Sequence, residues 1–245
     1  MRLRWVFLFL AFCTGLFLTL TLWLVAAKTE QLPPLQVHPL PPSLRQWQDS
    51  SNSGDYFSEV KPVKVGSLVW SRFPIVVYVE MSDSSERRAV AWRKAVLQAV
   101  KEWHVYLPIE LSEHPETADI TIWRRNPPRQ RLRDGKLARA RSGETRYELY
   151  VSQTPEKPPL LLHRCTISIS PNQTELYITA SARHELGHAL GIWGHSRLET
   201  DALYFSQVRN PPRISPRDVN TLKRVYQQPT RLGWPLGMGN KAKEY

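Results

Sequence analysis

Cysteine is nearly absent from this sequence. Only Cys13 and Cys165 occur among its 245 residues, which excludes a disulfide scaffold and a four-cysteine zinc site. Acidic residues are also scarce, since 22 Asp and Glu stand against 33 Lys and Arg for a formal net charge of +11. That excess favours anionic partners without naming one. Disorder throughout the chain is excluded, because 42% of the residues are hydrophobic and 10% are aromatic.

One long stretch, residues 5–27, carries no charge at all. As a helix its 23 residues would extend about 34 Å, enough to cross a hydrocarbon core of about 30 Å. Residues 1–27 are therefore predicted to be a signal anchor. A cleaved signal peptide is the alternative, because the small residues at 25–27 offer a cleavage site. The two arginines before the stretch favour a cytoplasmic amino terminus, with the rest of the chain exported.

The remaining chain divides by composition. Residues 28–55 contain five prolines and a polar run, and because proline removes backbone donors and favours extended chain, they are expected to form a semi-rigid linker. A globular pattern occupies residues 56–230, where one domain is expected. Residues 231–245 are rich in glycine and are expected to form a flexible tail.

Strand and helix patterns both occur within the domain. Strands are predicted from β-branched runs and alternation, strongly at 73–80 and 118–123 and weakly at 147–152, 166–170 and 176–179. Helices are predicted at about 84–104, 181–191 and 216–226. Asp83 and Ser215 are the expected caps of the first and the last helix. The fold class expected is therefore α+β.

Most of the excess charge is local. Segment 124–142 holds eight basic residues and one acidic residue, so it carries +7 of the net +11. The simplest interpretation is a solvated loop. The alternative is electrostatic attachment to anionic lipid headgroups or to an acidic substrate. Nucleic acid is not expected as a partner, because the segment has no interleaved aromatic residues and the domain is expected to be exported.

The sequence RHELGHALGIWGHS, beginning at Arg183, indicates chemistry. His184 and His188 are four residues apart, so a helix places both imidazoles on one face, within reach of one Zn²⁺. Glu185 would project beside the ion, at the position of a base for zinc-bound water.

A catalytic zinc site needs a third protein ligand and one open position. Gly191 can adopt a positive φ and turn the chain back beneath the metal, which makes His195 the natural third ligand. His163 is the alternative third ligand. Cys165 is more simply a small buried hydrophobic residue than a nucleophile.

The run HELGHALG…GHS over 184–196 resembles the zinc-binding signature of the metzincin clan of metallopeptidases, and specifically of the matrixin family. Further segments resemble matrixin segments in the same order: the strand at 73–80, the helix at 84–104, Ala-Asp-Ile at 118–120, and 214–226. The resemblance covers about residues 68–228.

The resemblance implies a metzincin-like zincin domain: a twisted mixed sheet with an antiparallel edge strand over the cleft, a backing helix, an active-site helix and a C-terminal helix. It also implies one catalytic Zn²⁺ held by His184, His188 and His195, with Glu185 as general base. Tyr204, near the metal by analogy, is expected to help stabilise the oxyanion.

Two departures concern the metal site. The family places two residues between the glycine and the third histidine, whereas three separate Gly191 from His195, and Gly194 makes a bulge there inexpensive. Leu203 stands where the family has a methionine below the metal, and Leu can replace Met as an apolar floor. No further structural zinc or calcium is predicted, because the loop before the active-site helix lacks the family's ligands.

The function expected is a zinc-dependent endopeptidase that hydrolyses peptide bonds through a zinc-bound water activated by Glu185. Its partners would be a peptide or protein substrate and the membrane, and it is expected to be a monomer. The expected location is a single-pass membrane protein with an extracytoplasmic catalytic domain, or a secreted protein after signal cleavage. The alternative function is a catalytically inactive, membrane-anchored zincin-fold module that binds peptide or an anionic polymer.

Overall fold

The computed structural model describes residues 32–81, 85–129 and 131–236. The predicted signal anchor at 1–27 and the predicted cap Asp83 lie outside these residues. Among the helices of the described ranges, none combines the length and the apolar character needed to cross a bilayer.

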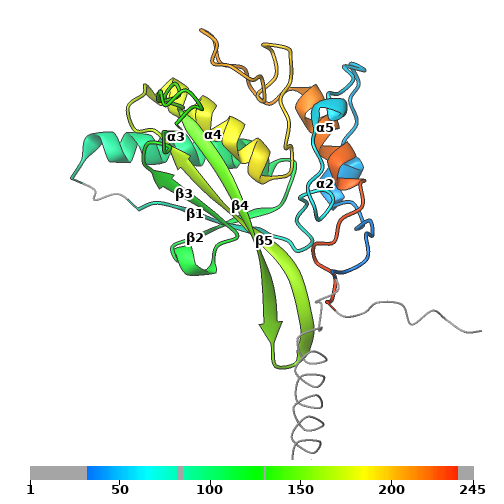
Figure 1. Cartoon of the computed structure of the whole chain (residues 1–245). Coiled ribbons are helices and arrows are strands. Elements are labelled where there is room, and N and C mark those ends of the chain that lie inside the picture. The colour runs from blue at the N-terminus through cyan, green and yellow to red at the C-terminus, as the bar shows by residue number, and fades with distance from the viewer. Residues whose placement is uncertain (1–31, 82–84, 130, 237–245) are drawn as a thin grey trace, which may run out of the picture.

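One mixed sheet forms the centre of the fold (Figure 1). Its strands follow the order β2-β1-β3-β5-β4, with the bounds β1 Ile75–Val79, β2 Ile109–Ser112, β3 Ile120–Arg124, β4 Gly143–Thr154 and β5 Lys157–Ile169. Four strands are parallel, and the edge strand β4 is antiparallel to β5. This mixed sheet, together with the helices, confirms the expected α+β class.

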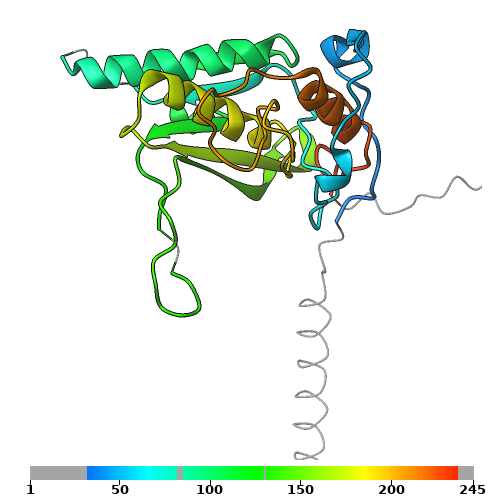
Figure 2. The same ribbon diagram turned by 90° about the horizontal axis from the view of Figure 1, so that it is seen from above.

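Two long helices lie on the same side of the sheet, α3 (Arg87–His104) and α4 (Glu175–Ala189) (Figures 1 and 2). The apolar positions predicted for α3 are all buried, at 0 to 2% exposure: Ala89, Trp92, Val96, Ala99 and Trp103. The Trp103 indole donates a 2.8 Å hydrogen bond to the carbonyl oxygen of Arg183. This contact joins α3 to the segment that carries the HELGH sequence.

The fold differs from the sequence prediction around α4. The weak strand predicted at 176–179 is wrong, because these residues form the first turns of α4. Ile178, Ala182 and Leu186 follow one another at steps of four and are all buried, so helical periodicity decides the conformation. Strands β4 and β5 are also longer than predicted and form one hairpin that extends beyond the rest of the sheet (Figure 1).

The segment expected to be a linker is part of the domain where it is described. Leu44, in the short helix α2 (Pro42–Gln46), is fully buried. Ser43 Oγ donates a 2.6 Å hydrogen bond to the carbonyl oxygen of Tyr106, and Trp47 Nε1 donates a 2.8 Å bond to Asn220. Prolines interrupt regular structure here, but buried apolar side chains still attach the segment to the core.

The expected tail also packs onto the domain as far as residue 236. Leu232 is 1% exposed, and Trp234 stacks on His38 with ring centroids 4.3 Å apart. The globular unit therefore includes residues on both sides of the predicted 56–230 boundaries. The short helices η1 (Phe57–Glu59) and η2 (Pro115–Thr117) complete the fold with the C-terminal helix α5 (Pro216–Tyr226).

Helix α5 confirms the cap predicted at its start. The Ser215 hydroxyl accepts from the backbone N–H of Asp218, and the Asp218 carboxylate accepts from the backbone N–H of Ser215. This reciprocal capping box fixes the first turn of α5. It also brings the Asp218 carboxylate to the turn at residues 201–204, which lies beneath the histidine cluster described next.

Candidate metal centre

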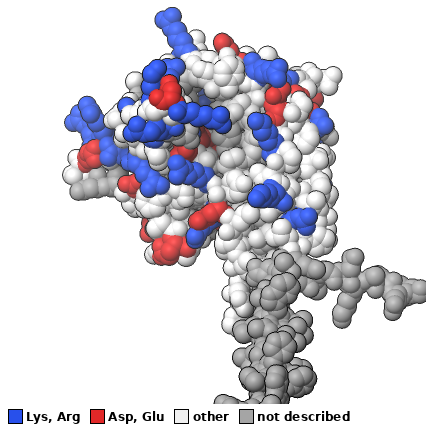
Figure 3. Space-filling model, viewed as in Figure 1, with Lys and Arg blue, Asp and Glu red and all other residues white. Residues whose placement is uncertain are grey.

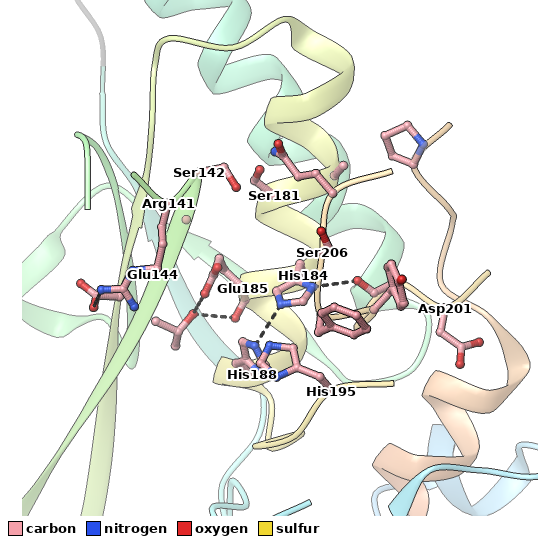
Figure 4. A pocket seen from close by; sticks show the side chains of 18 of the residues that line it. Arg141, Ser142, Glu144, Ser181, His184, Glu185, His188, His195, Asp201 and Ser206 are labelled. Atoms are coloured by element: carbon pink, nitrogen blue, oxygen red, sulfur yellow. Dashed lines mark hydrogen bonds and ion pairs between the residues drawn. The ribbon is translucent and has the colours of Figure 1, made fainter. Parts of the chain in front are cut away.

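The three histidines selected from the sequence come together in the structure. One ring nitrogen from each of His184, His188 and His195 lies within 4.8 Å of the others. Figure 4 shows the first two on helix α4 and the third arriving from the chain that follows it. This proximity is close enough for all three side chains to bind one metal ion.

Two of the rings are oriented by backbone carbonyl groups. His184 Nδ1 lies 2.9 Å from the Ala202 oxygen, and His188 Nδ1 lies 2.7 Å from the Ile192 oxygen. Because a carbonyl oxygen only accepts, each Nδ1 carries the proton and each neutral ring keeps a free lone pair on Nε2. These two Nε2 atoms are 3.1 Å apart.

That pair of Nε2 atoms fits a bound cation. Two lone pairs cannot satisfy one another by hydrogen bonding, but a metal ion accepts both. Tetrahedral zinc with Zn–N distances of about 2.0–2.1 Å separates two nitrogen ligands by about 3.3 Å, close to the observed 3.1 Å. The two carbonyl groups would support a bound metal without touching it, because they fix the tautomer and the direction of each ring.

Burial keeps the rings in their neutral form. It lowers the pKa of His184 and of His188 to about 4 each, and the neighbouring imidazole adds to the effect. The pKa of His195 is also lowered, first by desolvation and then by His188. At neutral pH all three imidazoles are therefore uncharged, which is the form that binds metal.

Glu185 lies beside the cluster, between α4 and the edge strand β4 (Figure 4). It is 8% exposed, and the Thr145 hydroxyl lies 2.6 Å from its Oε2. Burial raises the pKa of the Glu185 carboxyl group, against the lowering influence of His188 and Thr145. A carboxylate made more basic in this way is suited to accept a proton.

Two residues that position Glu185 could not be recognised from the sequence. Thr145 is a polar residue in the β4 segment, and Gly143 is a glycine at its start. A Cβ on Gly143 would lie 2.5 Å from Glu185 Cγ, so only glycine leaves room for the carboxylate here. Pairing of β4 with β5 brings both residues to Glu185, and local sequence patterns do not reveal such long-range contacts.

The chain reverses directly after α4. Gly191 has φ +130°, and the N–H of Ile192 donates to the Gly187 oxygen at 3.0 Å. The positive φ predicted for Gly191 is thereby confirmed. A Cβ at this position would lie 2.8 Å from the Leu68 carbonyl oxygen. Backbone conformation and close packing both require glycine at this position.

The three residues between Gly191 and His195 are accommodated by packing. A Cβ on Gly194 would lie 2.3 Å from the Glu59 carbonyl oxygen, and the N–H of Lys61 donates to the Trp193 oxygen at 3.1 Å. The Trp193 ring stacks on His188 with centroids 5.9 Å apart. The chain between Gly191 and His195 therefore packs against the η1 region, and the His195 ring still lies close to the other two rings.

Leu203 forms an apolar floor below the helix. It is fully buried, and a Cβ on Gly187 would lie 2.5 Å from its Cδ2 atom. The preceding residue, Ala202, supplies the carbonyl group that orients His184. The Leu203 oxygen accepts a 2.9 Å hydrogen bond from the N–H of Ser196, the residue after His195. One turn thus contacts both parts of the cluster.

Two fully buried carboxylates hold this turn. Asp201 accepts from Ser196 Oγ, from Ser215 Oγ at 2.7 Å and from Arg217 Nε at 3.1 Å. Asp218 accepts from the N–H of Ala202 at 2.8 Å. Sequence reasoning missed both carboxylates as supports of the site, although the Ser215 cap with an acidic residue three positions later was a signal for Asp218.

The other residues considered from the sequence lie elsewhere or at the rim. His163 is on β5, outside the cluster, where it stacks on Trp70 at 3.9 Å and burial lowers its pKa to about 3. Cys165 is 2% exposed, and burial raises the pKa of its thiol, as expected for a buried hydrophobic residue. Tyr204 lines the cleft beside the histidines.

The cluster opens onto a cleft of about 830 Å³. One wall comes from β4 and the residues before it, including Gly143 and Thr145, and the other from Tyr204, Phe205 and the Pro211–Pro212 segment. Glu185 and the three histidines lie in the lining between these walls. A peptide-sized ligand can therefore reach both the possible metal ligands and the buried carboxylate.

No model of a known protein family matches the chain, and no curated protein matches it. What the site can do is therefore argued from its own geometry, which consists of a histidine cluster able to bind a metal and a buried carboxylate beside it in a cleft.

Proposed function

We propose that the chain is a zinc-dependent endopeptidase of the metzincin clan, with a matrixin-like domain. The observation that carries this proposal is the pairing of two different groups on one helix. The carbonyl-oriented His184 and His188 rings direct free Nε2 atoms at one point, and Glu185 projects into the same cleft. A purely structural metal site has no use for this carboxylate, whereas hydrolysis requires a base.

Features away from the helix support the same proposal. The sheet has an antiparallel edge strand beside the cleft, a glycine with positive φ ends the active-site helix, and an apolar turn lies under the histidines. The matrixin resemblance implies the edge strand and the turn below the metal, and the glycine at 191 was expected from its own conformational freedom. Leu203 fills the place of the family's methionine, and the longer loop before His195 is packed against η1.

The chain's own residues would then divide the chemistry. His184, His188 and His195 would hold the metal, which, when bound, supplies a Lewis acid that polarises a carbonyl group and acidifies a water molecule. Glu185 would take a proton from water and deliver it to the departing amine. The Thr145 hydroxyl keeps the Glu185 carboxylate in place. The free edge of β4 would pair with the main chain of an extended peptide.

The proposal includes a location. Residues 5–27 would anchor the chain in a membrane with the catalytic domain outside the cytoplasm, and signal cleavage would instead release it. Substrates would be peptides or proteins, taken by a monomer.

The decisive experiment compares Glu185→Gln with Glu175→Gln in the full chain. Glu175 is exposed in the first turn of the same helix, so this control removes the same charge outside the cleft. Glu185→Gln is expected to retain one equivalent of zinc by elemental analysis and to lose about 10²- to 10⁴-fold in peptide cleavage. Glu175→Gln is expected to cleave peptides like the wild type. A chelator is expected to stop cleavage by the wild type and by Glu175→Gln alike.

Other results would reject the proposal in recognisable ways. Protein that binds no zinc, or cleavage that does not depend on Glu185, contradicts it directly. Zinc held by the three histidines without cleavage of any member of a peptide library would favour the alternative, a non-catalytic module that binds peptide or an anionic polymer.

A further inference from the structure

The basic segment between β3 and β4 forms a projecting hairpin. The N–H of Leu132 donates to the Lys136 oxygen at 2.7 Å, the N–H of Gly135 donates to the Leu132 oxygen at 3.0 Å, and Arg131 forms a bridge with Leu137. Arg129 and residues 131–139 are together called the basic hairpin below. Figure 2 shows it extending away from the sheet, on the side opposite to α3. These backbone contacts close the turn of the hairpin.

The positive charges of the segment fall into two groups. Those at its base are paired, because Arg124 contacts Glu86 at 2.7 Å and Arg141 contacts Glu144 at 2.7 Å. Among the described residues, Arg129, Arg133 and Arg139 have no hydrogen-bond or ion-pair partner, and all three are exposed. Figure 3 shows Lys and Arg side chains gathered on this face of the molecule. The unpaired charge therefore lies on the projecting part.

Two exposed leucines lie among these arginines. Leu132 is 50% exposed and Leu137 is 53% exposed. Electrostatic repulsion accounts for a loop that stands in solvent, but it gives no reason for apolar side chains at the tip. A soluble acidic polymer would neutralise the arginines and leave the leucines in water. An anionic lipid surface offers phosphate to the arginines and hydrocarbon to the leucines.

We propose that the basic hairpin docks on a bilayer that contains anionic lipid, with Arg129, Arg133 and Arg139 at the headgroups and Leu132 and Leu137 inserted between them. Each basic residue near such a surface strengthens binding by about fivefold. Arg139 also lines the cleft, so docking would hold one rim of the cleft next to the membrane. The inference does not depend on the proposed peptidase activity.

The test measures backbone hydrogen exchange in the full chain, without zinc or peptide. The protein is mixed with vesicles of phosphatidylcholine alone or with vesicles that also contain phosphatidylglycerol. Exchange in residues 131–139 is expected to slow only with the anionic vesicles and to recover in high salt, since salt screens exposed charges. The triple variant Arg129→Gln, Arg133→Gln, Arg139→Gln is expected to need roughly a hundredfold more anionic lipid for equal protection.

Two further variants test whether protection depends on the charges and the leucines of the basic hairpin in particular. Replacing Arg87, Arg88 and Lys94 on exposed positions of α3 by Gln removes the same charge elsewhere, and protection is expected to remain. Leu132→Ser with Leu137→Ser is expected to weaken protection while all the arginines stay in place. Equal protection by neutral vesicles, or equal loss in the α3 control, would overturn the inference. Protection by soluble polyglutamate without protection by anionic vesicles would overturn it in favour of an acidic polymer.

Discussion

The two parts of the histidine cluster are built in different ways. His184 and His188 belong to one helix, and a backbone carbonyl orients each ring. His195 is exposed and lies beyond the chain reversal, and its place depends on the backbone of the residues around it. The helical part thus follows from local geometry, whereas the loop part follows from the packing of Gly191, Gly194 and the 201–204 turn.

This difference indicates which part of the cluster is sensitive to substitutions elsewhere in the domain. A helix keeps its i and i+4 side chains together whenever it forms, so the spacing of His184 and His188 needs no distant support, and only the orientation of each ring depends on a carbonyl group outside the helix. The position of His195 depends on two buried carboxylates, Asp201 and Asp218, which hold the 201–204 turn. Damage to that network is expected to separate His195 from the helical pair without unfolding α4.

The largest expected effect is that of Asp201→Asn. Asp201 is fully buried and pairs with Arg217 at 3.1 Å, and breaking a buried ion pair costs about 3–5 kcal/mol. Zinc affinity is expected to fall by about 10- to 100-fold through the misplaced His195. Denaturant unfolding and zinc competition titrations measure the two effects. Glu199→Gln, an exposed change in the same loop, is the control, and equal behaviour of both variants would contradict the assignment.

Low pH is expected to decrease the free energy of unfolding through the buried histidines of helix α4. In metal-free protein the pKa of His188 is about 4, against about 6.5 for an unfolded histidine. Between these values the unfolded chain binds more protons, so stability is complete above pH 6.5 and falls as the pH decreases toward 4. The loss is about 3 kcal/mol for this ring.

Urea unfolding of the metal-free protein at several pH values tests this expectation. His188→Gln should make the dependence shallower, with the remainder due to the other buried histidines, whereas His114→Gln should leave it unchanged, because the His114 side chain is 72% exposed. A free energy of unfolding that stays constant from pH 7 to pH 4.5 would be inconsistent with neutral, buried rings.

Gly191→Ala probes the connection between the two parts. The substitution introduces backbone strain at φ +130° and a contact 2.8 Å from the Leu68 oxygen, and is expected to destabilise the fold by about 1–3 kcal/mol. Gly135→Ala is the matched control, since Gly135 also has a positive φ but no neighbouring atom within 4 Å. Thermal unfolding should show the larger decrease for Gly191→Ala, and the reverse order would refute the packing argument.

The smallest effect is expected for Leu203→Met, which introduces the methionine that the proposed matrixin resemblance implies at this position. Volume-conserving exchanges of this kind cost less than about 1.5 kcal/mol, so zinc binding and cleavage should persist. Leu203→Ala leaves a cavity beneath α4 and is expected to cost about 2–5 kcal/mol. If Met disturbed zinc affinity as much as Ala does, Leu203 would be more than an apolar floor.

The same contrast explains what could be predicted from the sequence. Helical spacing predicted His184 and His188, and glycine chemistry predicted the reversal at Gly191, because these are local properties. Thr145 and Gly143 reach Glu185 only through the pairing of β4 with β5, and Asp201 reaches Ser196 and Arg217 only after α5 has packed. No short-range pattern contains those contacts.

Composition misled in a similar way. Prolines in 28–55 and glycines after 231 indicated segments without regular structure, and most of the described residues in both segments do lack it. Yet Leu44 and Leu232 are buried, because apolar burial stabilises irregular chain as well as helix and strand. Absence of a periodic pattern is therefore a poor guide to where a domain ends.

The loop between Gly191 and His195 places a tryptophan where its fluorescence can report on the histidine cluster. This loop holds the Trp193 indole against His188, with its other side edge-on to Tyr147 at 5.1 Å. Indole emission responds to charge and to proton exchange on an adjacent imidazole. Occupancy of the cluster should therefore register as a change in intrinsic fluorescence that Trp193→Phe abolishes, so metal uptake can be followed without attaching any dye.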